Sequence, residues 1–200
     1  MFDQGELDRE FFAALRLADA EIAAAVGGHG CRRCGGRLHR GDYPRKPRGA
    51  LVAAAGEEHV VRFSFCCGRE GCRRRTTPPS LRFMGRRVYL EAVVLIASVV
   101  AALDGASRAT ARGVGVPART LARWLGWWRG SFLATAEFVS LAAVLALATT
   151  DARSTMPTPL WRGSPSHSDP AKSAWIARRL APLTTVTSTM PWSSILRGLP

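Results

Sequence analysis

The chain has 200 residues, a length that allows one or two small domains with a hydrophobic core. Its 28 Lys and Arg residues outnumber its 15 Asp and Glu residues, and the net charge of +13 predicts an anionic partner. The N-terminus is acidic and lacks the pattern of a secretory signal, and the cysteines have metal-like spacing, so we expect a cytoplasmic protein with reduced thiols.

A helix is predicted near the N-terminus, in a segment taken as residues 1–28. Apolar residues recur every three or four positions over residues 6–26, with acids concentrated in the early turns, and Gly27 and Gly28 end the pattern. Residues 1–26 carry six acidic and two basic residues, so the outer face of this helix is expected to be acidic. We therefore expect it to pack or to contact another protein rather than nucleic acid.

Two close cysteine pairs follow within residues 29–80. Two residues separate Cys31 from Cys34, and four separate Cys67 from Cys72. Such pairs lie on tight turns and present four thiolates to one tetrahedral ion, which predicts a zinc ribbon with structural Zn²⁺. Disulfides or a redox pair are the alternatives. The glycines after the first pair disfavour the helix that a redox motif opens, and five cysteines fit a disulfide framework poorly.

The third ligand is ambiguous from spacing alone because Cys66 directly precedes Cys67. Strand alternation places Cys67 on the face of the neighbouring phenylalanines and Cys66 on the opposite face, so Cys67 is preferred, and His39 is a substitute candidate. Strands are predicted around residues 51–54 and 60–65. So small a unit lacks a sufficient core, and metal binding is expected to supply roughly 10 kcal/mol or more of its folding free energy.

A basic extended segment leaves the second cysteine pair, and two prolines keep it out of a helix. It is a candidate phosphate clamp or, alternatively, a solvated charge run. Its basic residues are Arg73, Arg74 and Arg75.

Residues 81–132 are predicted to form a helix-turn-helix. An apolar helix spans 88–103, Ser107 caps a short helix, and Pro117 begins a third. In the third helix apolar and basic positions alternate at helical spacing, so its apolar side is expected to dock on the preceding helices. A helical hairpin with a solvated cationic face is the alternative. The residues left available to a DNA major groove are Arg119, Thr120 and Arg123.

An apolar helix is predicted over residues 133–150. It falls short of the roughly 20 apolar residues that span a bilayer and contains Glu137, so we expect packing or homo-oligomer formation and no membrane span.

The C-terminal residues 151–200 carry eight Ser, six Thr and seven Pro without sustained periodicity. This composition predicts disorder, with a brief helix as an alternative around 171–180. The expected fold class is α+β, mostly α: a small β zinc ribbon, a helix-turn-helix bundle and a poorly structured C-terminal tail.

Three motifs together resemble the N-terminal zinc-ribbon and helix-turn-helix modules of insertion-sequence transposases and of small bacterial transposase-like proteins. They are CRRCGGRL at 31–38, FSFCCGREGCRRRT at 63–76 and PARTLARW at 117–124. The resemblance covers residues 31–132 and implies zinc-dependent binding of duplex DNA, hence association with the nucleoid. A separate transposase, or another protein, is a candidate partner of the acidic N-terminal helix. The ribonuclease H-like catalytic domain of those families has no counterpart, so no enzymatic activity is expected.

Two other classes of function remain open from the sequence. A transcriptional regulator would use the same DNA-binding parts at a promoter. A protein-interaction adaptor would bind a partner through the ribbon and the apolar helices. Its arginines would then face solvent without contacting nucleic acid. Binding of RNA through the ribbon and the tryptophans is a third alternative.

Overall fold

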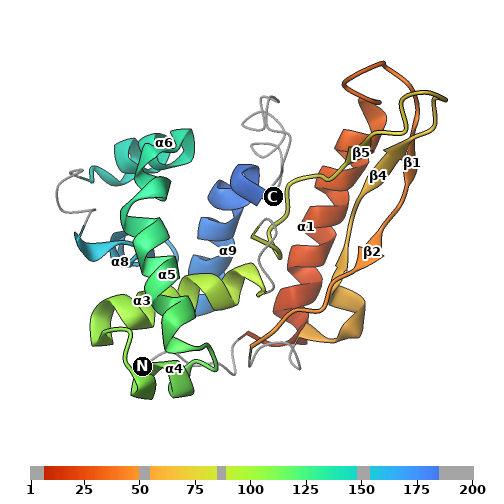
Figure 1. The fold of residues 1–200 in the computed structure, drawn as a ribbon. Helices are drawn as coiled ribbons and strands as arrows, with labels where there is room; N and C mark the ends of the chain where they lie inside the picture. Colours follow the sequence, from red (N-terminus) through yellow and green to blue (C-terminus); the bar gives the residue numbers. More distant parts are fainter. Residues whose placement is uncertain (1–6, 50–54, 85–88, 148–153, 185–200) are drawn as a thin grey trace.

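The structure is a computed structural model that describes residues 7–49, 55–84, 89–147 and 154–184. Its architecture is α+β and mostly α, as predicted. Helix α1 (Arg9–Gly28) and the β-ribbon beside it form one side of the molecule, and helices α3 to α9 form the other (Figure 1).

Helix α1 joins the two sides. It begins after Asp8, whose carboxylate accepts a hydrogen bond of 2.9 Å from the backbone N–H of Phe11. Its middle turns enter the large hydrophobic core through Leu15 and Ile22, whereas Val26 near its end packs in a second, smaller cluster under the ribbon. The predicted helix and its apolar face are therefore confirmed.

The ribbon consists of two small antiparallel sheets. The three-stranded sheet has the order β1 (Leu38–Arg40), β4 (Phe65–Cys67), β5 (Arg75–Thr76). The two-stranded sheet pairs β2 (Tyr43–Pro44) with β3 (Val61–Arg62), and the short 3₁₀ helix η2 (Glu57–His59) precedes β3. The strand predicted at 51–54 lies outside the described residues.

The predicted strand alternation is present in the second hydrophobic cluster. Phe63, Phe65 and Cys67 all lie in this cluster with Leu38, on the side of the sheet that faces α1. The cluster is small, with seven buried residues in the part of the chain that the structure describes. Hydrophobic burial alone therefore gives the ribbon little stability.

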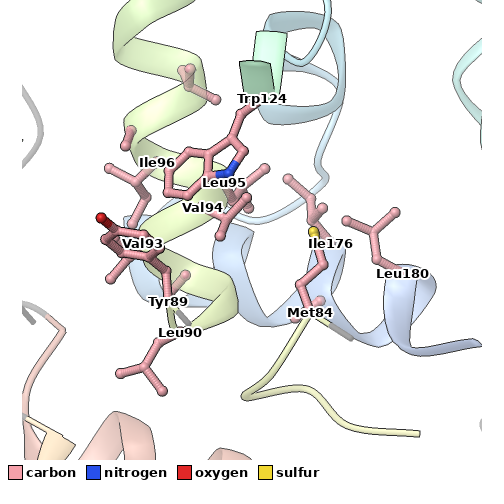
Figure 2. Packing of buried hydrophobic residues seen from close by; sticks show 14 of the residues in the cluster. Met84, Tyr89, Leu90, Val93, Val94, Leu95, Ile96, Trp124, Ile176 and Leu180 are labelled. Carbon is pink, nitrogen blue, oxygen red and sulfur yellow. The ribbon is translucent and has the colours of Figure 1, made fainter. Parts of the chain in front are cut away.

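The three helices predicted within 81–132 are present as α3 (Glu91–Asp104), α4 (Arg108–Gly113) and α5 (Ala118–Arg129). Ser107 caps α4 as predicted, because its hydroxyl accepts a hydrogen bond of 3.1 Å from the N–H of Thr110. Helix α3 is buried along most of its length. Figure 2 shows Trp124 of α5 packed beside Val94 and Leu95 of α3, and Trp124 also meets Tyr89 edge-on.

The apolar segment after α5 forms two short helices, η3 (Ser131–Ala134) and α6 (Ala136–Leu145), rather than one helix over 133–150. Phe138 and Leu141 are the buried residues of α6. Val139 and Val144 on its other side are 65% and 66% exposed. The final predicted residues, 148–150, lie outside the described part of the chain.

The prediction of a disordered tail needs a correction over residues 154–184. This segment contains α8 (Thr158–Arg162), α9 (Asp169–Leu180) and η4 (Ala181–Thr184), so the brief helix foreseen around 171–180 is present. Ile176 and Leu180 of α9 are completely buried and lie in the core near Met84 (Figure 2). Packing of this apolar face against α3 stabilises a segment whose composition disfavours order. Residues 185–200 lie outside the described residues.

Candidate metal centre

The first cysteine pair lies on a tight turn, the first knuckle, that directly follows α1. The carbonyl oxygen of Cys31 accepts hydrogen bonds from the N–H groups of Cys34, at 3.2 Å, and Gly35, at 2.6 Å. The N–H of Cys31 donates in turn to Gly36 O at 2.8 Å, which closes the turn. Gly35 has a φ of 69°, a left-handed conformation that glycine adopts without steric cost.

The second cysteine pair lies on the second knuckle, between β4 and β5. Cys67 ends β4, where its N–H donates to Arg74 O at 2.9 Å, and the N–H of Cys72 donates to Arg69 O at 3.1 Å. The N–H of Gly68 donates to Arg37 O at 2.9 Å and so fixes this knuckle to the strand that leaves the first one. The sheet thereby brings the two knuckles face to face.

The four predicted ligands converge. The Sγ atoms of Cys31, Cys34, Cys67 and Cys72 all lie within 4.8 Å of one another. The Cys31 to Cys72 distance is 3.8 Å and the Cys34 to Cys67 distance is 3.5 Å, both far beyond the roughly 2.05 Å of a disulfide. Tetrahedral coordination with zinc–sulfur bonds of about 2.3 Å requires sulfur separations of about 3.8 Å. The geometry is that of a metal-binding cluster, and all five cysteines are free thiols.

The thiols perturb one another's protonation. The backbone N–H of Arg33 is the main group that lowers the pKa of Cys31, to about 7. At Cys67 the backbone N–H of Arg69 acts to lower the pKa, but burial and the neighbouring thiols outweigh it and raise the pKa to about 12. A raised pKa beside a lowered one is what closely packed thiols produce, and a cation between them would favour the thiolate form of all four.

The ambiguity over the third ligand is resolved in favour of Cys67. The Cys66 thiol points away from the cluster and donates to Arg73 O at 3.4 Å. His39 pairs with Cys66 across the β1–β4 ladder, is exposed, and does not belong to the cluster.

Gly36 permits the close approach of the two knuckles. A Cβ at this position would lie 3.1 Å from Cys67 Sγ and 3.3 Å from Cys34 Sγ. We expect Gly36→Ala to weaken metal affinity about tenfold without removing a ligand, because the sulfurs must shift to admit the methyl group. Competition titration with a zinc chelator measures this. Gly41→Ala is the control, since a Cβ there meets nothing within 4 Å; an equal effect of both changes would contradict the explanation.

The predicted DNA-contacting residues fall into two groups that the structure does not bring together. Arg73, Arg74 and Arg75 are exposed beside the second knuckle, whereas Arg119 and Arg123 are exposed on the N-terminal half of α5, with Thr120 half-buried next to them. Figure 1 shows the knuckle end of the ribbon and the start of α5 at opposite ends of the molecule. The apolar side of α5 is buried as predicted.

Arg75 differs from its two neighbours. Its guanidinium lies 3.4 Å from Ser64 Oγ and over the ring of Tyr43, so it contacts the ribbon itself. Arg73 and Arg74 are therefore the better candidates for contact with an external anion.

A buried ionic group that the sequence analysis did not identify links the ribbon to the helices. Asp19 is 1% exposed on the inner side of α1, where one of its oxygens accepts a hydrogen bond of 2.8 Å from Arg82 Nε and another of 2.5 Å from Ser80 Oγ. Its other oxygen accepts from the N–H of Leu81 at 2.6 Å. The guanidinium of Arg82 also donates to the carbonyl of Val61 at 3.0 Å, in β3. The expectation that the acids of this helix face outward is therefore wrong for Asp19.

A second buried arginine extends this network to the C-terminal helices. Arg62 Nη2 donates to Pro78 O at 2.6 Å, and the N–H of Ser80 donates to Thr184 Oγ1 at 2.8 Å, after α9. Burial lowers the pKa of Arg62 to about 10 and also lowers the pKa of Arg82. The position of Asp19, four residues after Leu15 and three before Ile22 on the apolar face, was the available sequence signal.

The fold and the site define an α+β protein with a cluster of four cysteines arranged to hold a metal ion. No family model matches the chain, and neither the curated proteins nor the solved structures compared with it include a match. Among the described residues, no helix combines the length and apolar character needed to cross a membrane.

Proposed function

We propose that the protein is a zinc-dependent module of transposon origin that binds duplex DNA. The observation that carries this proposal is the convergence of four cysteine sulfurs at the end of an arginine-rich ribbon. Four thiolates in a tetrahedral arrangement suit structural Zn²⁺, with no position left open for a catalytic water. The four residues that would hold the ion are Cys31, Cys34, Cys67 and Cys72.

The proposed DNA contacts follow from the exposed basic groups. Arg73 and Arg74 contact phosphates, since guanidinium groups bind phosphate oxygens with bidentate geometry. Arg75, which also contacts Ser64 and Tyr43, is a weaker candidate for the same role. Arg119 and Arg123 are four residues apart and exposed on the same face of α5, with Thr120 beside them, as required for a helix that reads base edges in a major groove. Helices α4 and α5 supply the helix-turn-helix of this proposal.

The first test combines zinc analysis of the purified chain with the salt dependence of its binding to a DNA duplex, before and after chelation. We expect one zinc per chain and a steep loss of affinity with salt, because neutralised phosphates release counterions. Chelation should abolish binding through unfolding of the ribbon. Zinc without DNA affinity would refute DNA binding, and absence of zinc would refute the metal centre.

The role of α5 is tested by sequence preference. Arg119→Ala and Arg123→Ala are each expected to relax preference at one base position at a cost of about 1–3 kcal/mol, the worth of a bidentate base contact. Selection from randomised duplexes measures this. Arg162→Ala, which removes an exposed arginine from α8, is the matched control and should leave the selected sequence unchanged. A uniform loss of affinity across all sequences would assign the α5 residues to phosphate contacts.

A protein-interaction role is the second candidate, favoured by the exposed apolar side chains Val139 and Val144 on α6. The exposed acids Glu10 and Glu21 of α1 offer a separate contact for a partner such as a transposase. Under this alternative, DNA binding would be weak and its salt dependence shallow.

A further inference from the structure

Arginine side chains from both knuckles gather around the metal cluster. Two belong to the first knuckle, one to the second, and three flank the knuckles in the adjoining strands and loops; all six are exposed. They come from two sequence segments, at least 32 residues apart, that the metal-binding fold brings to one end of the ribbon. These residues, here called the knuckle surface, are Arg32, Arg33, Arg37, Arg69, Arg73 and Arg74.

Hydrogen bonds within and between the two knuckles hold this surface together. The carbonyl of Arg37 accepts from Gly68 N–H and the carbonyl of Arg74 accepts from Cys67 N–H, each at 2.9 Å. Arg69 Nη1 reaches across to Cys34 O at 3.2 Å and so connects the two knuckles. Arg37, Arg69 and Arg74 thus take part in the contacts that bring the two cysteine pairs together.

The surface has a strong excess of positive charge. Glu70 is the only acidic residue within segments 29–40 and 65–76 of the sequence. A zinc ion bound by four thiolates carries a net charge of −2, which offsets only part of six guanidinium groups. The remaining charge lies on exposed side chains at the knuckle end of the ribbon, where a polyanion has access.

The backbone at Arg73 gives an independent indication. Its φ is 43°, in the left-handed region that favours glycine, so an arginine here places a charged side chain on the surface at an energetic cost. Strained positions of this kind cluster at functional sites.

We propose that the knuckle surface is the principal phosphate-binding surface of the protein and that its ligand is the sugar-phosphate backbone of duplex DNA. This inference rests on the proposed function and adds Arg32, Arg33, Arg37 and Arg69 to the contacts. The sequences of the two knuckles contain no aromatic residue, whereas proteins that bind single strands stack bases on exposed aromatic rings. The surface therefore binds phosphate without reading bases, and α5 supplies sequence preference.

The test compares two double variants with the same change in charge. Arg33→Gln with Arg37→Gln removes two guanidinium groups from the knuckle surface, and Arg16→Gln with Arg162→Gln removes two exposed ones elsewhere. Removing two phosphate contacts should lower the slope of log affinity against log salt by about 1.8 and reduce affinity at 0.1 M salt by about tenfold or more. The control variant should change the slope by much less. Zinc content confirms that both variants retain the ribbon.

Arg73→Gly separates binding from folding. Glycine fits the left-handed backbone, so this variant should keep its zinc and unfold at a higher temperature than the wild-type protein. Its slope of log affinity against log salt should nevertheless fall by about 0.9, because one phosphate contact is lost.

A knuckle variant that binds like its control, while the wild-type protein binds DNA, would overturn the inference and leave the proposed function intact. A wild-type protein that binds no duplex DNA would overturn both. Tighter binding to single-stranded DNA or duplex RNA of the same sequence would overturn the choice of ligand.

Discussion

Replacing Cys67 by serine is expected to abolish zinc binding and to unfold the ribbon while the helical part stays folded. The ribbon has only a small hydrophobic cluster, and Cys31 and Cys67 themselves form part of it. Structural zinc sites contribute about 10 kcal/mol or more to folding, and burial in so small a cluster does not offset the conformational entropy of the ribbon without that contribution. The large core formed mainly by the helices does not include the metal ligands.

Elemental analysis measures the zinc content of this variant, and limited proteolysis detects unfolding of its ribbon. Zinc should fall from one ion per chain to none, and cleavage should appear between residues 31 and 76, with the helical circular dichroism signal largely kept. Cys66→Ser is the matched control, because it makes the same chemical change one residue away, at a thiol that faces Arg73 O rather than the cluster. Loss of zinc in the Cys66 variant, or zinc retained in the Cys67 variant, would contradict the assigned ligand set.

Local patterns in the sequence were sufficient to predict the metal cluster. Pair spacing identified Cys31, Cys34 and Cys72, and the alternation of strand β4 selected Cys67, because both signals extend over only a few residues. The helices of residues 91–129 were predictable for the same reason, from apolar periodicity, the cap at Ser107 and the proline before α5.

Features that depend on distant contacts were not predictable. The pairing of β2 with β3 joins residues about 18 positions apart, and neither strand is long enough to show a pattern of its own. The residue composition of helix α9 indicates a helix only weakly. The helix is stabilised by burial of Ile176 and Leu180 in a core built mainly by other helices. The ionic network requires Asp19 to meet Arg82, 63 residues later in the chain, which no local pattern indicates.

Loss of the Asp19 carboxylate from this buried network is expected to destabilise the protein strongly. Asp19→Ala should reduce the free energy of unfolding by about 3–5 kcal/mol, because Arg82 would remain buried without its counter-ion. The Arg82 side chain is 0% exposed and lies 2.8 Å from the carboxylate, and burial already lowers its pKa. The hydroxyl of Ser80 and the N–H of Leu81 would lose their acceptor in the same change.

Urea denaturation, followed by tryptophan fluorescence in the presence of saturating zinc, measures this loss. Glu21→Ala is the matched control, since Glu21 is an exposed acid on the same helix and its removal should change stability by no more than about 0.5 kcal/mol. Equal stability of the two variants would show that Arg82 does not depend on Asp19. Because Asp19 and Arg82 connect α1, β3 and the segment before α3, the loss should appear in both parts of the molecule. One buried ion pair thus contributes to the stability of the contact between the ribbon side and the helices.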